Sequence, residues 1–204
     1  MKNTLFLLII LFSTLIKSQS VTIDITKSGF GEPDGCYRKD LNNLLNPFVG
    51  TYIYNNGNSS FKIVLKKMIM QPRLGNYEDL IIGEYQYIEN GLEKINTLAN
   101  IDVVYSNQFL KHNIAGNRII TKITSRLWQC SQCNPNEKRL IVVLEDKISG
   151  RNADFLMRRT IINGQEVMQV RIQNISSKPI NVDFNEPPQP EFSLPKGEFI
   201  MIKQ

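Results

Sequence analysis

The stretch Phe155-Leu-Met-Arg-Arg-Thr-Ile-Ile-Asn-Gly-Gln-Glu-Val-Met-Gln-Val-Arg-Ile172 predicts a β-hairpin. Asn163-Gly164 at its centre supplies two residues that tolerate positive φ, as a two-residue type I′ turn requires. Pairing outward from this turn sets Phe155 opposite Ile172 and places every second residue on one face. A slip of one residue would expose the whole apolar face, so the register is well specified. That face holds Phe155, Met157, Ile161, Met168, Val170 and Ile172, with Arg159 and Glu166 as its polar exceptions.

Two further Asn-Gly dipeptides, Asn56-Gly57 and Asn90-Gly91, lie between segments with strand-like alternation and predict further hairpins. Short connections between consecutive strands favour an all-β fold, an antiparallel meander of about nine strands. We expect either a curled sheet or a lipocalin-like up-and-down barrel. The expected strand pairs are Val49–Tyr54 with Ser60–Met70, Leu80–Glu89 with Leu92–Ala99, and Asn117–Trp128 with Lys138–Asp146; a last strand is Glu198–Lys203, and a short helical turn is Lys39–Leu45.

Residues 1–20 predict a secretory signal peptide. Lys2 precedes an apolar run of roughly 12 residues, and small residues follow it. The run is shorter than the roughly 20 residues that a bilayer-spanning helix needs, so an uncleaved anchor is the less favoured alternative. Cleavage near Ser18–Val21 would leave an extended segment with a short helical turn at residues 21–47 and a barrel-like domain at residues 48–204. We expect a secreted or periplasmic protein with no transmembrane segment in the mature chain.

The charge balance argues against a nucleic-acid partner. Removal of Lys2 and Lys17 with the leader leaves 22 of the 24 basic side chains against 19 acidic ones, a net charge of about +3. The remaining basic residues include isolated pairs inside strand patterns, Lys66-Lys67 and Arg158-Arg159, and no run or stripe that would form an electrostatic footprint. We therefore expect no nucleic-acid binding.

Four segments carry a family resemblance: Gly35-Cys-Tyr-Arg-Lys-Asp40, Asn46-Pro-Phe-Val-Gly-Thr-Tyr52, Gly83-Glu-Tyr-Gln-Tyr-Ile-Glu-Asn-Gly-Leu-Glu-Lys-Ile-Asn-Thr-Leu98 and Cys130-Ser-Gln-Cys-Asn-Pro-Asn-Glu-Lys-Arg-Leu140. They resemble an uncharacterised domain family of short secreted proteins from Gram-negative bacteria of the Bacteroidetes type. The resemblance implies export and a small β domain, and it brings no activity because that family has no assigned function. Phe48-x-Gly50-Thr51-Tyr52 is also distantly similar to the Gly-x-Trp entry of lipocalin-like barrels, which implies a fold and no ligand.

Cys130 and Cys133 lie in one loop, and in an exported protein such a pair predicts a disulfide. A thiol–disulfide redox protein is an alternative function. Redox reactivity needs a thiolate at a helix N-terminus, whereas Asn134-Pro135-Asn136 directly after the pair indicates a turn. Cys36 is the remaining cysteine, and it is either buried and free or the true partner of Cys130 or Cys133.

A structural zinc site is a second alternative, because Cys36, His112, Cys130 and Cys133 would supply four ligands. They do not form two close couples, as zinc modules usually have, so we expect neither a metal nor a cofactor. Nucleophilic hydrolysis would need a positioned histidine base. His112 is the single histidine, and its polar neighbours predict an exposed loop position. Paired carboxylates stay open as an alternative, with solvated strand ends as the simpler interpretation: Asp79, Glu84, Glu89, Glu93 and Asp146.

Four residues are candidates for ligand binding. Arg159 falls on the apolar face of the hairpin, where it either reaches water at a strand end or points inward. An inward Arg159 would pair with Glu84 or with an anionic ligand in a barrel cavity, and the strand-end position is the favoured interpretation. Tyr85 and Trp128 are expected in the core or barrel wall rather than in a binding platform. The sequence predicts a non-enzymatic exported β domain that binds a small ligand or an envelope protein.

Overall fold

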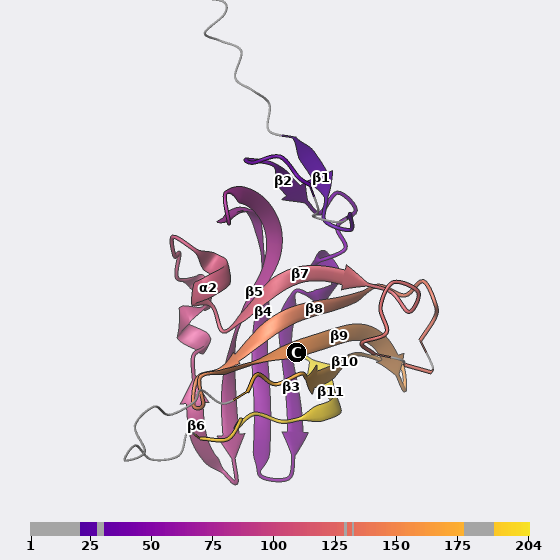
Figure 1. Cartoon of the computed structure of the whole chain (residues 1–204). Coiled ribbons are helices and arrows are strands. Elements are labelled where there is room, and N and C mark those ends of the chain that lie inside the picture. Colours follow the sequence, from indigo (N-terminus) through magenta and orange to yellow (C-terminus); the bar gives the residue numbers. More distant parts are fainter. Residues whose placement is uncertain (1–20, 28–30, 129, 132, 178–189) are drawn as a thin grey trace, which may run out of the picture.

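The computed structural model of the chain describes residues 21–27, 31–128, 130–131, 133–177 and 190–204, so the expected signal peptide lies outside the described residues. The chain is all-β: eight antiparallel strands form a closed barrel, and further strands are attached to it (Figure 1). The helical elements are short: η1 (Asn46–Phe48), η2 (Leu98–Asp102) and α2 (Gln108–Lys111). The barrel strands are β3 (Gly50–Asn56), β4 (Ser59–Arg73), β5 (Asn76–Glu89), β7 (Ile114–Ile120), β8 (Arg139–Asp146), β9 (Arg151–Ile162), β10 (Gln165–Gln173) and β11 (Gly197–Lys203), and the attached strands are β1 (Thr22–Asp24), β2 (Tyr37–Lys39) and β6 (Leu92–Asn96).

Barrel strands that are consecutive in the sequence lie next to each other. The barrel closes because the last strand, β11, pairs with the first, β3, and because β5 pairs with β7 across the intervening segment. Two glycines lie at the β5–β7 seam, with Gly83 opposite Ile114 and Gly116 opposite Ile81. A Cβ on Gly83 would lie 2.5 Å from Cδ2 of Leu65, and a Cβ on Gly116 would lie 3.0 Å from the backbone of β8. The glycines therefore avoid clashes with the neighbouring strands β4 and β8, and at Gly83 also with Ile114 across the seam, whose Cβ would lie 3.1 Å from the new Cβ.

The β9–β10 hairpin confirms the predicted register, because Phe155 lies opposite Ile172 and Asn163-Gly164 forms the turn. Both turn residues have positive φ, 51° and 77°. The predicted apolar face is buried inside the barrel, apart from Ile161, which is 69% exposed next to the turn. The alternation of apolar and polar residues therefore predicted the strands and the register of this hairpin correctly.

One predicted turn is shifted, and one turn was not predicted. Asn56 pairs with Ser59, so the β3–β4 loop consists of Gly57-Asn58 and is shifted by one residue from the predicted Asn-Gly turn. β4 and β5 continue beyond the predicted ends at Met70 and Leu80, because they are joined by an additional hairpin turn at Leu74-Gly75. That turn was missed because a leucine stands where Asn or Gly is usual.

Further boundaries also differ from the predictions. β7 ends at Ile120 instead of Trp128, because the hydroxyls of Thr121 and Thr124 close a turn directly after it. β6 is shorter than predicted. The expected helix at Lys39–Leu45 is a turn, in which the Asp40 carboxylate accepts the backbone N–H groups of Leu44 and Leu45, and the helical turn comes later at η1.

The barrel interior is filled with apolar side chains. Inward-facing residues of all eight strands pack into one cluster. A cavity large enough for a ligand would leave the side chains that line it accessible to water. The described interior is therefore not hollow, which argues against the expected small ligand inside the barrel. Residues of this cluster with no exposed surface include Phe61, Ile63, Ile81, Tyr85, Ile114, Leu140, Phe155, Met157, Met168, Val170 and Met201.

The outer face of the β9–β10 hairpin is partly covered as well. Leu156 on that face packs with Trp128 and with the disulfide between Cys130 and Cys133. Below the same loop, the guanidinium of Arg139 is fully buried and its Nη1 donates to the carbonyl oxygen of Trp128. The loop between β7 and β8 thus forms a second, smaller core on the outside of the barrel.

A polar network fixes this loop to the sheet. Arg158 donates to Glu137 at 2.6 Å and to Oε1 of Gln169 at 2.7 Å. Gln169 and the indole N–H of Trp128 each donate to one oxygen of the Glu198 carboxylate on β11. Since Arg158, Gln169 and the indole N–H of Trp128 all have partners, they can be buried beneath the loop at little net cost, whereas Nε and Nη2 of Arg139 are buried there without a partner.

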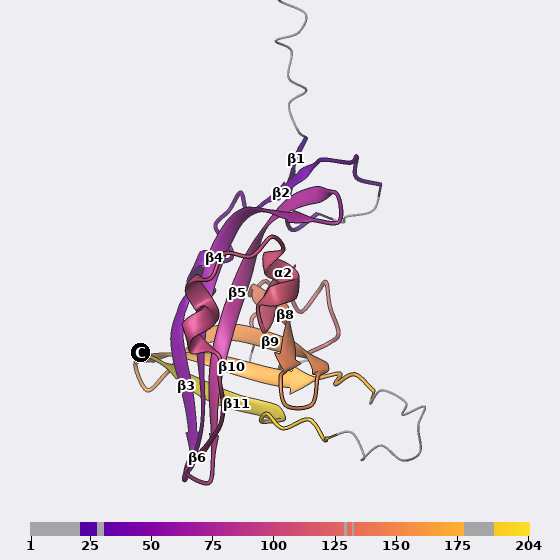
Figure 2. The same ribbon diagram turned by 90° about the vertical axis from the view of Figure 1, so that its left-hand side faces the viewer.

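The N-terminal segment adds two parallel strands to the sheet. β1 pairs with β2, and β2 pairs with the first residues of β5, with Tyr37 opposite Tyr77. Figure 2 shows β1, β2 and the hairpin between β4 and β5 at one end of the molecule, beyond the barrel. We call residues 69–77, which form this protruding hairpin, the arm.

Candidate functional site

Three adjoining hollows run along the outside of the barrel beside α2. They measure about 270 Å³ between the arm and β2, about 190 Å³ over β7 and β8, and about 280 Å³ beneath α2. Arg73 and Asn117 line both the first and the second hollow, and Phe109, Ala115 and Val143 line both the second and the third. We call these three adjoining hollows together the α2 groove. Its other lining residues include Arg38, Glu78, Arg118, Asp154, Glu145 and Asn152.

A buried polar cluster holds the chain around α2 against β5. His112 follows α2, and its ring makes two hydrogen bonds: Nδ1 to Oε1 of Glu84 at 2.8 Å and Nε2 to Oε1 of Gln108 at 2.7 Å. The side chains of His112 and Glu84 are almost inaccessible, with exposed fractions of 0% and 1%. Tyr105 packs edge-on against the imidazole ring. The prediction of an exposed loop histidine is therefore wrong, because Glu84 on the outer face of β5 offers it a buried partner.

Asn113 completes the cluster and lines the groove. Its Nδ2 donates to Oε2 of Glu84. A carboxylate has only acceptors, so the amide of Asn113 must turn its nitrogen toward Glu84 and its oxygen away. That oxygen, Oδ1, is buried without a hydrogen-bond partner, as is Nε2 of Gln108. Since the two ring nitrogens of His112 are both engaged, the imidazole cannot also serve as a free general base in this arrangement.

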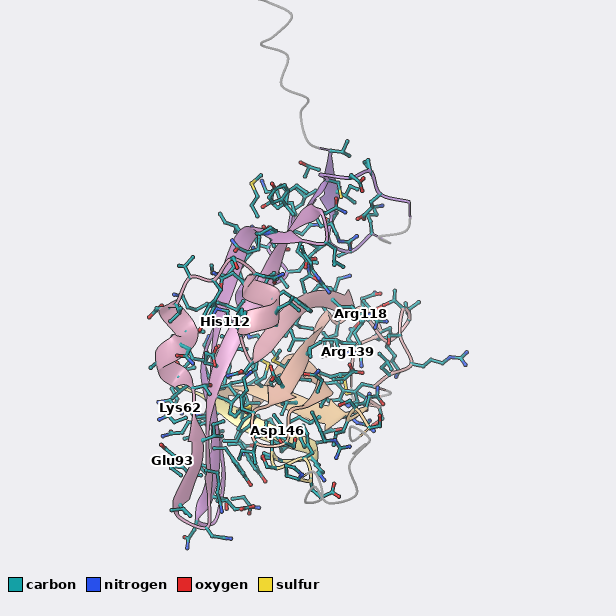
Figure 3. All side chains as sticks on the ribbon, turned by 60° about the vertical axis from the view of Figure 1, so that its left-hand side comes forward. Lys62, Glu93, His112, Arg118, Arg139 and Asp146 are labelled. Carbon is teal, nitrogen blue, oxygen red and sulfur yellow. A yellow bond between two sulfur atoms is a disulfide. The ribbon has the colours of Figure 1, made fainter. Side chains whose placement is uncertain are left out.

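The arm end of the groove is organised by Arg73. Its guanidinium lies 3.7 Å from the centroid of the Phe109 ring and donates to Glu78 at 2.7 Å. Glu78 also accepts the amide of Asn117 at 2.9 Å. Arg118 lies farther along β7, across the view from His112 in Figure 3, and among the described residues its side chain has no hydrogen-bond or ion-pair partner. The groove therefore offers one uncommitted guanidinium at its middle.

The candidate ligand residues do not converge. Arg159 ion-pairs with Glu166 near the end of the hairpin, in agreement with the strand-end interpretation. Glu84 and Tyr85 are adjacent in β5 and so face opposite sides of the sheet: Tyr85 lies inside the barrel, where its hydroxyl donates to the carbonyl oxygen of Glu145, and Glu84 lies under α2. Arg159 on the inward face could not reach Glu84. Trp128 anchors the loop after β7.

The cysteines also separate. Cys130 and Cys133 form a disulfide inside a turn and are each 5% exposed, which agrees with the predicted pairing. Cys36 is free and buried, 3.6 Å from Glu32, and burial raises the pKa of its thiol. The predicted zinc alternative is not assembled, since two of its sulfurs are bonded to each other and His112 contacts Glu84 instead. No group of three or more His, Cys, Asp or Glu side chains that could hold a metal occurs among the described residues.

The carboxylates likewise serve separate contacts. Asp79 binds Tyr37 and backbone N–H groups, Glu84 binds the His112 cluster, and Asp146 accepts Ser149 and Ser193. They do not form the convergent pair that acid–base chemistry requires. The expected solvated strand ends are wrong for these three, because each carboxylate is buried with its partners.

The whole chain matches one known protein family. Residues 1–204 match the model of a family of unknown function (DUF6705). The chain belongs to the DUF6705 family. No curated protein and no solved structure matches this DUF6705 protein. In the part of this DUF6705 chain that the structure describes, no helix combines the length and the apolar character needed to cross a membrane.

Proposed function

We propose that this DUF6705 protein is an exported, non-catalytic binding protein that holds an extended polypeptide segment in the α2 groove. The observation that carries the proposal is that three hollows adjoin one another and share lining residues. Such a shape suits an elongated ligand, whereas the filled barrel interior leaves no room for a compact one.

The charges along the groove support a polypeptide. Arg118 would attract an acidic side chain near the middle, while Asp154 over β9 would attract a basic one. Val143, which is 38% exposed on the floor between them, offers an apolar contact. A chain of mixed side chains satisfies all three kinds of contact at once.

A glycan is disfavoured by the aromatic content of the groove. Among the described residues that line the three hollows, the Phe, Tyr and Trp side chains are Tyr77 in the first hollow and Phe109 in the second and third. One face of the Phe109 ring is covered by the guanidinium of Arg73. An exposed ring face, on which a sugar would stack, is therefore restricted there.

A peptide-display library tests the groove. Residues 21–204, which contain every described element, are used to select peptides, and the selected peptides are tested against Val143→Arg. This substitution places a long charged side chain on the half-exposed floor, so we expect it to abolish binding. The matched control is Ile161→Arg, on an exposed strand position of the distant hairpin turn. The proposal fails if no peptide is enriched, or if both variants bind the selected peptides equally.

Export is tested separately. The full chain is expressed in a Gram-negative host, and the mass of the mature protein is measured in the medium and the periplasm. We expect the recovered chain to begin near Ser18–Val21, because the small residues there fit a signal peptidase site. A cytosolic protein that keeps residues 1–20 contradicts this part of the proposal.

A further inference from the structure

The arm carries apolar side chains that the fold leaves exposed. Ile69 is 65% exposed, Met70 49%, Leu74 93% and Tyr77 39%. The single charged residue of the arm, Arg73, is neutralised by its ion pair with the adjacent Glu78. The tip of the arm is therefore apolar and effectively uncharged, although it protrudes from the molecule.

Leucine at position 74 is also unfavourable for the backbone conformation of the turn, which has a positive φ at this residue. It has φ of 48° and is followed by a glycine, the same backbone conformation as the Asn-Gly turns of this chain, in which Asn90 has φ of 53° and Asn163 has φ of 51°. Left-handed backbone is costly for residues with a bulky side chain, whereas Asn tolerates it. The chain thus places a strained, almost fully exposed leucine where its other hairpins of this kind place asparagine. Neither the turn nor the core explains this choice.

The position of the arm indicates what it contacts. It lies at the same end of the molecule as β1 and β2, in the views of both Figure 1 and Figure 2. β1 begins at Thr22, and the predicted signal peptide ends directly before it. If the predicted signal peptide is removed there, the new N-terminus lies at the same end of the molecule as the arm. Val21, at the expected new N-terminus, is itself 53% exposed.

We propose that the arm is a membrane-contact element that inserts Leu74 and its apolar neighbours into the surface of a lipid bilayer. A side chain that protrudes with 93% of its surface exposed suits a fluid apolar phase better than a flat protein surface. The inference rests on the proposed export, and it does not depend on what the α2 groove binds, although Leu74 and Tyr77 also line the first hollow of that groove. Because the charge of the arm is neutralised, the interaction is driven by apolar burial and is insensitive to salt.

Vesicle flotation tests this element. Residues 21–204 are mixed with vesicles of phosphatidylethanolamine and phosphatidylglycerol, and the bound fraction is measured for the parent chain and for Leu74→Asn. We expect the asparagine variant to unfold at a higher urea concentration, because the strain is relieved, and to bind vesicles about tenfold more weakly. A merely structural residue would not show these opposite effects. Leu92→Asn, at an exposed leucine beside the β5–β6 turn at the other end, should bind as the parent does.

A fluorescence measurement locates the contact. In a Trp128→Phe background, Leu74→Trp places a single indole at the tip, and its emission should shift to shorter wavelength with vesicles and be quenched by brominated lipid. The proposal is overturned if the parent chain does not float with vesicles, if Leu74→Asn and Leu92→Asn weaken binding equally, or if Leu74 instead mediates self-association of the protein in sedimentation experiments. Val143→Arg should leave vesicle binding unchanged, so failure of the groove and failure of the arm are distinguishable.

Discussion

The hydroxyl of Tyr37 on β2 donates to Oδ1 of Asp79 on β5 at 2.5 Å, and so joins the N-terminal strands to the base of the arm. The same carboxylate accepts the backbone N–H of Met70 at 2.9 Å and that of Asp40 at 3.0 Å. Met70 lies at a bulge of β4 with φ of 52°. One buried side chain therefore satisfies three donors from two segments, residues 37–40 and Met70 on β4, that are not paired with each other in the sheet.

The Tyr37–Asp79 contact predicts a loss of stability at alkaline pH. Burial, followed by the hydrogen bond to Asp79, raises the pKa of Tyr37 to about 12 from its usual value of 10.0. A raised pKa means that the folded state holds the proton more tightly, so this stabilisation is complete below pH 10 and is lost as the pH rises from 10 to about 12. Tyr37→Phe should make the pH dependence in this window shallower, as measured by urea unfolding.

The control for this experiment is Tyr77→Phe, which removes a hydroxyl from an exposed residue opposite Tyr37 in the sheet. Some alkaline sensitivity should remain in every variant, because burial also raises the pKa of Tyr85 inside the barrel. If the unfolding free energy of Tyr37→Phe falls between pH 10 and about 12 as steeply as that of the parent chain, then ionisation of Tyr37 does not affect stability through its contact with Asp79.

Substitution of Glu84 is expected to lower the free energy of unfolding. Glu84→Ala leaves Nδ1 of His112 and Nδ2 of Asn113 buried without their partner, which should cost about 3 kcal/mol of unfolding free energy. Glu84→Gln should cost less, because the amide of Asn113 can rotate and accept from the new side-chain nitrogen. Urea unfolding measures both variants. Hydrogen exchange of the amides around α2 should rise most in Glu84→Ala.

Glu93→Ala is the matched control, since Glu93 is an exposed carboxylate on β6 that bonds only to exposed amides. We expect it to change stability by less than about 0.5 kcal/mol. Equal effects of Glu84→Ala and Glu93→Ala would mean that the buried cluster does not hold the chain around α2.

The barrel strands were predictable where one face of a strand is buried in the core and the other is exposed to solvent. In β9 and β10 the alternation from Phe155 to Ile172, together with Asn163-Gly164, specifies strand, turn and register locally. The arm was missed for a local reason of the same kind, since Leu74 is not a residue that signals a turn. Where the residues that specify a strand or a turn are neighbours in the sequence, the prediction succeeds if they are of the types usual for that strand or turn.

The candidate site was not predictable in this way, because its partners come from distant segments. His112 looks solvated beside Lys111, and only the pairing of β5 with β7 brings it to Glu84. Similarly, Arg158 and Gln169 look like a solvated face until the loop carrying Trp128 covers them. A polar residue in the sequence does not reveal whether a distant polar residue will be buried with it.

The Cys130–Cys133 disulfide predicts a modest contribution to stability. It closes a very short loop, so its removal in a double Cys→Ser variant should cost about 2 kcal/mol and leave the barrel folded. Trp128, the only tryptophan of the chain, is 1% exposed in the same cluster and reports on the loop. Its fluorescence should shift to longer wavelength in the variant and on reduction of the parent chain.

Reduction also tests the thiol–disulfide alternative. The pair lies in a turn and lacks the helix N-terminus that would lower a thiol pKa, so the alkylation rate of the reduced protein should rise only as the pH becomes alkaline. A thiol that reacts rapidly below neutral pH would favour a redox function over the binding function proposed here.

Gly83 predicts how tightly the barrel seam is packed. Its φ is accessible to other residues, so the cost of Gly83→Ala comes from contacts: the new Cβ would meet Cδ2 of Leu65 at 2.5 Å and the carbonyl oxygen of Val64 at 2.9 Å. Urea unfolding should show a loss of about 1–3 kcal/mol. Gly164→Ala is the contrasting control, because it meets no atom within 4 Å and should cost only the strain of its positive φ.

A double-mutant cycle then separates the two contacts at the seam. Leu65→Ala removes the flexible side chain that the new methyl group meets, but it leaves the carbonyl oxygen of Val64 in place. The combined variant should therefore be more stable than the sum of the single losses, without a full recovery of the Gly83→Ala cost. Simple additivity would mean that Leu65 does not limit the approach of β5 to β4, and that backbone contact alone requires glycine at this position.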